Sequence, residues 1–358
     1  MSFNPLVCKD CNIECVFEQI GLLPSEPNIG TIGVSWKCPK CSSSSLDICV
    51  LGPNIPQKGS CLNCGQVYQN DICQNCGQTK AQEDKFFNYS SKDEATQNLY
   101  NIFNRGLVRQ AFLVANYILR EDLTNDEAWK FKASGLNFLG LKEQQLNLLK
   151  EALLAGAPSS LLISYGRALQ DAGQVQEAID VYDKYLSLPN IEKKAVVLSY
   201  KANSMVALEK YDEAGKLFLA AIDTDPQRIA SYTDYINLLG DLEQWDKSLE
   251  MIDKLSNISL NKEQTNNLLE EKSYVYAELG KGQQALTAAE TVLISNPKSV
   301  RGHYLRGRAL ALLGRLEEAQ GEMSIVLEFV PNHEDALSAL KMIDEALVKT
   351  KPTSWKFF

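Results

Sequence analysis

The chain has 358 residues, of which 36 are basic and 45 acidic, so its formal net charge is −9. No stretch of 18 uncharged apolar residues occurs, and the sequence therefore predicts no membrane-spanning helix. The acidic balance argues against affinity for nucleic-acid phosphates, because that affinity needs clustered lysine and arginine. The chain divides instead into a cysteine-rich head and a repetitive body.

All ten cysteines lie between Cys8 and Cys76, and eight of them form Cys-x-x-Cys pairs, or knuckles. Two cysteines at this spacing place both thiolates on one tight turn, which is half of a tetrahedral zinc site with Zn–S near ~2.3 Å. Four knuckles predict two structural Zn²⁺ ions in closed sites that leave no position open for catalysis. The predicted ligands are Cys8, Cys11, Cys38 and Cys41 for one site and Cys61, Cys64, Cys73 and Cys76 for the other, with alternate knuckles sharing a metal as the other arrangement.

Other chemistries of paired cysteines fit this sequence less well. A disulfide framework needs an oxidising compartment, and the opening residues MSFNPLVCKDC have neither the basic nor the apolar region of a secretory signal. A redox pair would adjoin a βαβ pattern, which is absent, whereas an iron–sulfur cluster stays an alternative to zinc. Cys15 and Cys49 fall outside the knuckles and are expected to be small buried apolar residues. The missing signal and the reduced thiols predict a cytoplasmic protein.

The two halves of the head differ in how closely they follow a known pattern. In CLNCGQVYQNDICQNCG, Gly65 and Gly77 follow the knuckles, where a left-handed backbone lets N–H groups approach the thiolates. The first half ends in a knuckle, a serine turn and a short strand predicted over Leu46–Leu51. Together the halves resemble a double zinc ribbon, although no glycine follows Cys11 or Cys41. That resemblance implies a small β-rich domain.

The head is predicted to span residues 1–80, and a linker over 81–91 joins it to the body. It contains five lysines, no arginine and six acidic residues, and each four-thiolate zinc centre adds negative charge. Zinc ribbons that bind DNA or RNA need a basic surface, which this head does not supply.

From about residue 92 onward the sequence repeats with a period near 34 residues. The clearest copy is VRGHYLRGRALALLGRLEEAQGEMSIVLEFVPNH, residues 300–333. Small residues recur in both halves of each copy, where two helices must approach closely, and proline ends the second helix of several copies. Aligning a central residue (Ala111, Gln145, Ala178, Ala214, Ser248, Ala285, Ala319) gives starts near 92, 126, 159, 195, 229, 266 and 300. Gly240 and the stretch Asn257–Asn261 suggest longer turns around the fifth copy.

The period and the small-residue pattern resemble the tetratricopeptide repeat (TPR) family over residues 92–349. The resemblance implies a mostly α protein: a right-handed α-solenoid of seven helix pairs over 92–333, closed by a capping helix over 334–350. In this family the first helix of each pair lines a groove, through its second, fifth, sixth, ninth, twelfth and thirteenth positions. Carried onto this sequence, the groove residues are Phe131, Ser134, Phe138, Arg167, Tyr200, Asn203, Asn237, Tyr274, Arg301, Tyr304 and Arg308.

Asn203 and Asn237 occupy the ninth position of neighbouring repeats. Family members often use asparagine there to bind a peptide backbone, which suits a side chain that both donates and accepts hydrogen bonds. The clamp that some members use for acidic C-terminal tails needs lysine and arginine at set groove positions. Ser199 and Thr233 stand four residues before the two asparagines, so that specific function is not expected.

Little in the sequence points to catalysis. Its two histidines, His303 and His333, have no nucleophile and carboxylate at motif spacing, and no phosphate loop or dinucleotide fingerprint occurs. The tail over residues 351–358 is aromatic, and it either folds back on the solenoid or acts as a short docking motif. Its aromatic residues are Trp355, Phe357 and Phe358.

The sequence therefore predicts a non-enzymatic scaffold or adaptor that binds a protein or peptide partner in the TPR groove. The zinc ribbons would dock a second protein or close the end of the solenoid. The first alternative is a nucleic-acid-associated regulator that uses the ribbons, and the second is a redox or metal sensor. The oligomeric state is not predicted.

Overall fold

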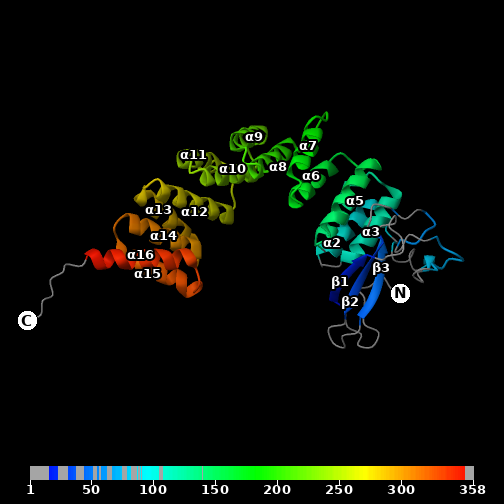
Figure 1. Ribbon diagram of the computed structural model, residues 1–358, viewed down its shortest axis with the longest axis horizontal. Helices are drawn as coiled ribbons and strands as arrows, with labels where there is room; N and C mark the ends of the chain where they lie inside the picture. The colour runs from blue at the N-terminus through cyan, green and yellow to red at the C-terminus, as the bar shows by residue number, and fades with distance from the viewer. Residues whose placement is uncertain are drawn as a thin grey trace, which may run out of the picture. The chain divides into compact units, whose positions relative to one another are not determined.

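A computed structural model describes residues 16–22, 31–37, 44–50, 55, 58–62, 67–74, 79–81, 87, 89, 91–104, 108–138 and 140–350. The chain divides into two compact units, Met1–Glu192 and Lys193–Phe358, and each is taken by itself (Figure 1). The aromatic tail with Trp355, Phe357 and Phe358 lies outside the described residues.

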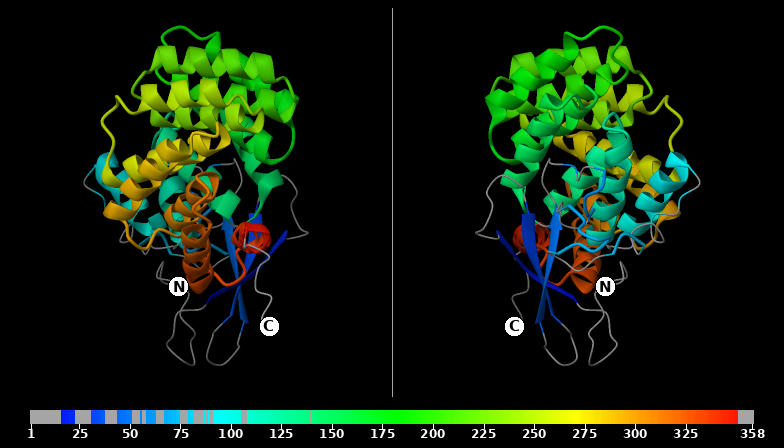
Figure 2. Two further views of the ribbon diagram at one scale, coloured as in Figure 1. Left: turned by 90° about the vertical axis from the view of Figure 1, so that its left-hand side faces the viewer. Right: turned by 90° about the vertical axis from the view of Figure 1, so that its right-hand side faces the viewer.

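Unit 1 begins with an antiparallel sheet of β1 (Val16–Leu22), β2 (Thr31–Lys37) and β3 (Ser44–Val50), which lie side by side in Figures 1 and 2. The predicted strand Leu46–Leu51 is confirmed as β3, which begins two residues earlier. Lys37 pairs with Ser44, so the knuckle of Cys38 and Cys41 falls in the connection between β2 and β3. β3 also contacts the helix α3 (Val108–Glu121), which ties the sheet to the helical part of the unit.

The helical part of unit 1 consists of three helix pairs in succession. Each helix packs on the next, and the first helices of consecutive pairs also touch, as stacking of repeats requires. One buried core runs through the unit from Leu62 to Ala168. The pairs are α2 (Lys92–Asn104) with α3 (Val108–Glu121), α4 (Asp126–Phe138) with α5 (Lys142–Leu154), and α6 (Leu161–Asp171) with α7 (Val175–Leu186).

Unit 2 repeats this arrangement four times and ends with a single helix, α16 (Glu334–Thr350). Figure 2 shows its helices packed antiparallel to their neighbours in sequence. The pairs are α8 (Lys194–Ala207) with α9 (Tyr211–Thr224), α10 (Ile229–Asp241) with α11 (Trp245–Leu255), α12 (Lys262–Glu278) with α13 (Gly282–Ser295), and α14 (Val300–Leu312) with α15 (Leu316–Phe329). The prediction of a mostly helical solenoid is confirmed.

The helix starts follow the sequence register with one clear exception. Five of the seven first helices begin within one residue of the predicted start and α6 within two, whereas α12 begins at Lys262 and not near 266. The cause is a capping box that the repeat alignment overlooked. Asn261 Oδ1 accepts from the Gln264 N–H at 2.9 Å, and Gln264 Oε1 accepts from the Asn261 N–H at 2.9 Å. The longer turn expected at Gly240 is wrong, because Gly240 lies inside α10.

The turns inside the last six helix pairs share one backbone conformation. In six turns the residue two before the second helix has a positive φ, and the next N–H bonds to the carbonyl five residues back, as in a Schellman motif. Glycine reaches positive φ without strain, but two of the turns use glutamate. These residues are Gly140, Gly173, Glu209, Glu243, Gly280 and Gly314.

Replacing Glu209 with glycine is expected to stabilise unit 2 by about 0.5–1 kcal/mol, because a side chain at φ 59° carries a steric cost that glycine avoids. Glu213→Gly is the matched control. Glu213 is exposed inside α9, so the same exchange there should destabilise by about 1 kcal/mol. Urea unfolding measures the change in the free energy of unfolding for both variants. If both variants changed that free energy in the same direction, the positive-φ turn at Glu209 would be contradicted.

Candidate functional site

The groove residues predicted in unit 2 lie on α8, α10, α12 and α14. Polar contacts join α8 to α10 and α12 to α14, each between residues about one repeat apart in sequence, and one pocket is lined by both α10 and α12. We call this surface the first-helix face. It carries Asn203, Asp234, Asn237, Glu271, Tyr274, Glu278, Arg301, Tyr304 and Arg308.

At the α8 end of this face, Asn203 is exposed and donates from Nδ2 to Asp234 Oδ2 at 3.4 Å. Burial raises the pKa of Asp234 above its ordinary value, while the Asn203 hydrogen bond and Arg228 oppose that rise. Tyr200 lies half-buried three residues before Asn203. The Asn203 amide therefore stays accessible to solvent while one carboxylate orients it.

At the α14 end, Arg308 joins two helices. Its Nη2 donates to Glu278 Oε1 at 2.7 Å, and its guanidinium lies 5.0 Å from the centre of the Tyr274 ring. Burial lowers the pKa of Arg308, but the hydrogen bond and charge of Glu278 together with Tyr304 and Tyr274 outweigh burial and leave the Arg308 pKa raised. Burial also raises the pKa of Tyr274, so the phenol keeps its proton and can donate.

Two further predicted residues complete this end of the face. Tyr304 stacks on the ring of His333 with centroids 5.4 Å apart, and burial raises the Tyr304 pKa. Arg301 is half-exposed and donates from Nη2 to Glu271 Oε1 at 2.5 Å. Aromatic and arginine side chains held in this way lose little freedom when a partner binds, which favours affinity.

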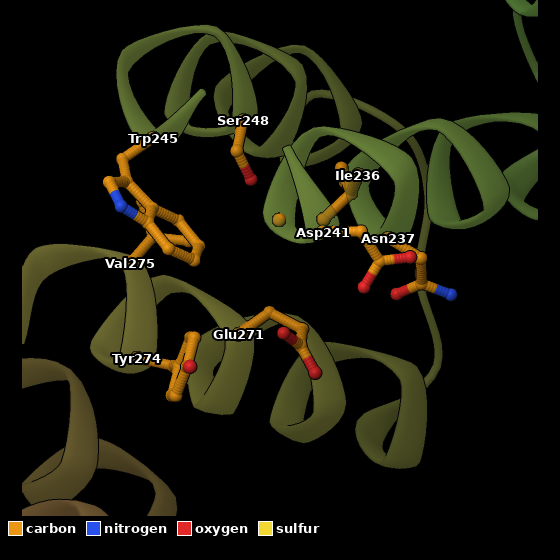
Figure 3. Close-up of a pocket in the computed structure, with 9 residues that line it drawn as sticks. Ile236, Asn237, Asp241, Trp245, Ser248, Glu271, Tyr274 and Val275 are labelled. Carbon is orange, nitrogen blue, oxygen red and sulfur yellow. The ribbon is translucent and has the colours of Figure 1, made fainter. Parts of the chain in front are cut away.

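A pocket of about 260 Å³ opens in this face between α10, α11 and α12 (Figure 3). Asn237 lines it, together with residues that the sequence prediction did not include. Asp241 and Glu271 stand at the thirteenth and sixth positions of their predicted repeats, so the same positional rule could have found them. Trp245 and Ser248 belong to a second helix, which that rule does not cover. The full lining is Ile236, Asn237, Gly240, Asp241, Trp245, Ser248, Glu271, Tyr274 and Val275.

The predicted groove residues of unit 1 lie on α4 and α6. Phe131 packs edge-on against Tyr100 with centroids 4.6 Å apart, and Phe138 is 71% exposed at the end of α4. Ser134 and Arg167 are exposed on α4 and α6.

Of the eight predicted metal ligands, the structure describes Cys61 and Cys73. Both are fully buried in one small cluster, with Tyr68 packed against it. The other six, Cys8, Cys11, Cys38, Cys41, Cys64 and Cys76, lie outside the described residues. Antiparallel bridges flank both turns, Ser60 with Val67 and Ile72 with Thr79, as expected for knuckles on β-hairpins. Two buried thiols brought together from separate turns fit a shared tetrahedral site.

The second knuckle pair is attached to the helices of unit 1. Leu62, next to Cys61, is fully buried in the helical core, and Arg120 Nη2 donates to the Ser60 carbonyl at 2.7 Å. In the segment predicted as a linker, Phe87 is buried and stacks on Tyr117 at 4.8 Å. This part of the head therefore packs on α3.

Both histidines make polar contacts within unit 2. His303 Nδ1 lies 2.7 Å from Glu322 Oε2 and its Nε2 lies 3.1 Å from the Pro297 carbonyl, so both ring nitrogens are engaged. His333 accepts from the Ala336 N–H at the start of α16.

Comparisons with known proteins agree with the repeat architecture. The tetratricopeptide repeat family model matches residues 271–327, from within α12 to within α15. No curated protein matches the chain in sequence. None of the helices in the described part of the chain has the length and apolar character to cross a bilayer.

Solved helical-repeat structures resemble the chain at low sequence identity. PilW, a widely conserved type IV pilus biogenesis factor, matches with a TM-score of 0.50 and 16% identity, over 60% of this chain and 97% of its own. The APC/C hetero-tetramer Cut9–Hcn1 matches with a TM-score of 0.50 and 11% identity, over 74% of this chain and 51% of that chain. YrrB, a TPR protein with an unusual peptide-binding site, gives 0.44 and 22%, over 51% and 92%. At such identities the likeness establishes the fold alone.

Proposed function

We propose that this chain is a non-enzymatic scaffold that binds a segment of a partner protein on its first-helix face. The observation that carries the proposal is the set of ordered polar and aromatic side chains on this face, joined between α8 and α10 and between α12 and α14. Exposed Asn203 and Asn237 offer donors and acceptors to an extended backbone, and Tyr274, Tyr304 and Arg308 supply aromatic and cationic anchors nearby.

The contacts between repeats support binding because they hold these side chains in place before a partner arrives. Asn203 bonds to Asp234, Arg308 to Glu278 and Arg301 to Glu271. When a long side chain is already ordered before binding, complex formation avoids an entropic cost of about 0.5–1.5 kcal/mol for ordering it. The half-buried aromatic rings beside them add apolar area at the same surface.

We further propose that residues 61–76 hold a structural Zn²⁺ through four cysteines and that this ribbon closes the first repeat of the solenoid. The shared burial of Cys61 and Cys73 supports the metal. Leu62 in the helical core and the Arg120–Ser60 hydrogen bond support the closing role. A solenoid needs such covers because its terminal repeat leaves an apolar face without a neighbour. A second Zn²⁺, on Cys8, Cys11, Cys38 and Cys41, belongs to the same proposal, as does cytoplasmic localisation.

Affinity purification of the tagged chain followed by mass spectrometry tests the scaffold proposal. Asn203→Ala/Asn237→Ala should reduce recovery of the principal partner at least about tenfold, since each buried hydrogen bond to a backbone is worth about 0.5–1.5 kcal/mol. Gln283→Ala/Gln284→Ala is the matched control, because both glutamines are exposed on α13, a second helix. Recovery of every partner by the asparagine variant would refute binding on this face.

A further inference from the structure

The pocket between α10, α11 and α12 lies where two first helices stand apart. In unit 2, α8 packs on α10 and α12 packs on α14, whereas α10 and α12 approach each other less closely than either of these pairs. The connection 256–261 and the additional turn of α12 separate the two helices at this step. The space between them is the pocket of about 260 Å³ shown in Figure 3.

One buried polar group in the pocket has no partner. Ser248 is 1% exposed, and its Oγ makes no hydrogen bond in the described part of the chain. Alanine occupies the equivalent position of the neighbouring repeats at Ala214, Ala285 and Ala319, so packing does not require a hydroxyl there. Figure 3 shows the Ser248 hydroxyl directed into the pocket. An unsatisfied buried hydroxyl costs about 1–3 kcal/mol, which a bound donor or acceptor would recover.

The charge of the pocket is negative. Asp241 has no ion-pair partner among the residues that the structure describes, and no basic side chain lines the space. Glu271 faces the same space and shares its charge with Arg301, whose Nη2 lies 2.5 Å from Glu271 Oε1. Asp241 is exposed, whereas the Glu271 side chain is 31% exposed, and a partly buried carboxylate interacts more strongly with a cation than one in open water.

The apolar wall of the pocket suits a cation as well. Trp245 and Tyr274 meet edge to face with centroids 5.9 Å apart, and both rings border the pocket. Tryptophan and tyrosine rings attract ammonium and guanidinium groups, and they cover the aliphatic stem behind such a group. Hydroxyl, carboxylate, amide and aromatic groups therefore converge on one space.

We infer that this pocket receives a basic side chain, lysine or arginine, from the segment bound on the first-helix face. The aliphatic stem would lie against the wall that Trp245 and Tyr274 form together. The charged head would donate to Asp241, Glu271 and the Ser248 hydroxyl. This inference rests on the proposed scaffold function and adds a specificity to it: the partner segment carries a basic residue at the position opposite α10 and α12.

The test uses the full chain with tryptophan indole nitrogens labelled with ¹⁵N. The chain has four tryptophans, and a Trp245→Phe variant identifies the Trp245 signal. The probes are the peptides acetyl-Gly-Gly-X-Gly-Gly-amide with X as lysine, arginine, norleucine or glutamate. Lysine and arginine peptides should shift the Trp245 signal in a saturable way, with dissociation constants on the order of 1 mM. Norleucine and glutamate peptides should not.

Two further variants are expected to change the affinity for the lysine peptide in opposite directions. Asp241→Asn should weaken binding of the lysine peptide about threefold to fivefold, and Arg301→Gln should tighten it about twofold, because Glu271 then loses its competing cation. Asp223→Asn is the matched control, since Asp223 is an exposed residue of α9 outside the pocket, and it should leave the affinity unchanged. Added salt should weaken the interaction.

Equal shifts with norleucine and lysine peptides, or no shift of Trp245 with any peptide, would overturn the inference. Weakening by both Asp241→Asn and Arg301→Gln would overturn it too, because that result indicates general damage. These failures are distinct from failure of the scaffold proposal. Partner recovery that depends on Asn203 and Asn237 would still stand if the pocket showed no preference for charge.

Discussion

Replacing Gly166 with alanine is expected to destabilise unit 1 by about 1–3 kcal/mol. An added Cβ would lie 2.3 Å from Cε1 and 2.7 Å from Cζ of Tyr182, so the ring of Tyr182 would have to move. That ring is fully buried and its hydroxyl donates to Gln170 Oε1 at 2.6 Å, which leaves it little freedom. The strain should exceed the gain of about 1 kcal/mol that alanine normally brings to a helix.

Urea unfolding gives the size of this effect, and hydrogen exchange of the peptides that cover α6 and α7 gives its location. Gly321→Ala is the matched control, because nothing lies within 4 Å of its added Cβ, and it should stabilise α15. Gly307→Ala should cost less than Gly166→Ala, since its nearest neighbour is the flexible end of Met323 at 2.5 Å. If Gly166→Ala stabilised the protein, the close approach of α6 and α7 would be wrong.

Metal analysis of the purified chain is expected to return two zinc ions per chain. Structural zinc in four-cysteine sites contributes an apparent binding free energy of about 10–16 kcal/mol, much of which is folding free energy. Chelation should therefore unfold the ribbon and raise hydrogen exchange in residues 58–62, which the Arg120–Ser60 hydrogen bond joins to α3. Cys73→Ser should lower the zinc content to one ion per chain.

Cys15→Ser and Cys49→Ser are the controls for this experiment, because neither residue belongs to a knuckle, and the zinc content should stay at two. Iron in place of zinc would favour the cluster alternative. Full zinc content in Cys73→Ser would contradict a site on Cys61, Cys64, Cys73 and Cys76. Loss of both ions from that single variant would indicate that the two metal sites depend on each other for folding.

The repeat fold could be predicted well because its determinants are local and periodic. The small residues Gly166 and Gly307, expected where two helices meet, do lie against the second helix of their pairs. Prolines 226, 297 and 331 each follow the end of a second helix by two residues. The one large error, at α12, arose because a capping box started the helix earlier than the repeat register suggested.

The functional residues were harder to predict, because a position within a repeat does not reveal what a side chain meets in the next repeat. Arg301 and Arg308 were expected to face a partner, and the structure pairs them with Glu271 and Glu278 of the preceding repeat. Ser248 could be read only as a small core residue, since its lack of a hydrogen-bond partner is a property of the packed state.

By itself the sequence determined the helical repeat, its approximate register and the positions where helices approach, because backbone propensity, small residues and helix caps act over a few residues. Only the tertiary structure decided which side chains on α8, α10, α12 and α14 are paired and where a pocket opens. Both depend on the spacing of consecutive first helices. That spacing widens between α10 and α12, where the connection and the start of α12 depart from the repeat.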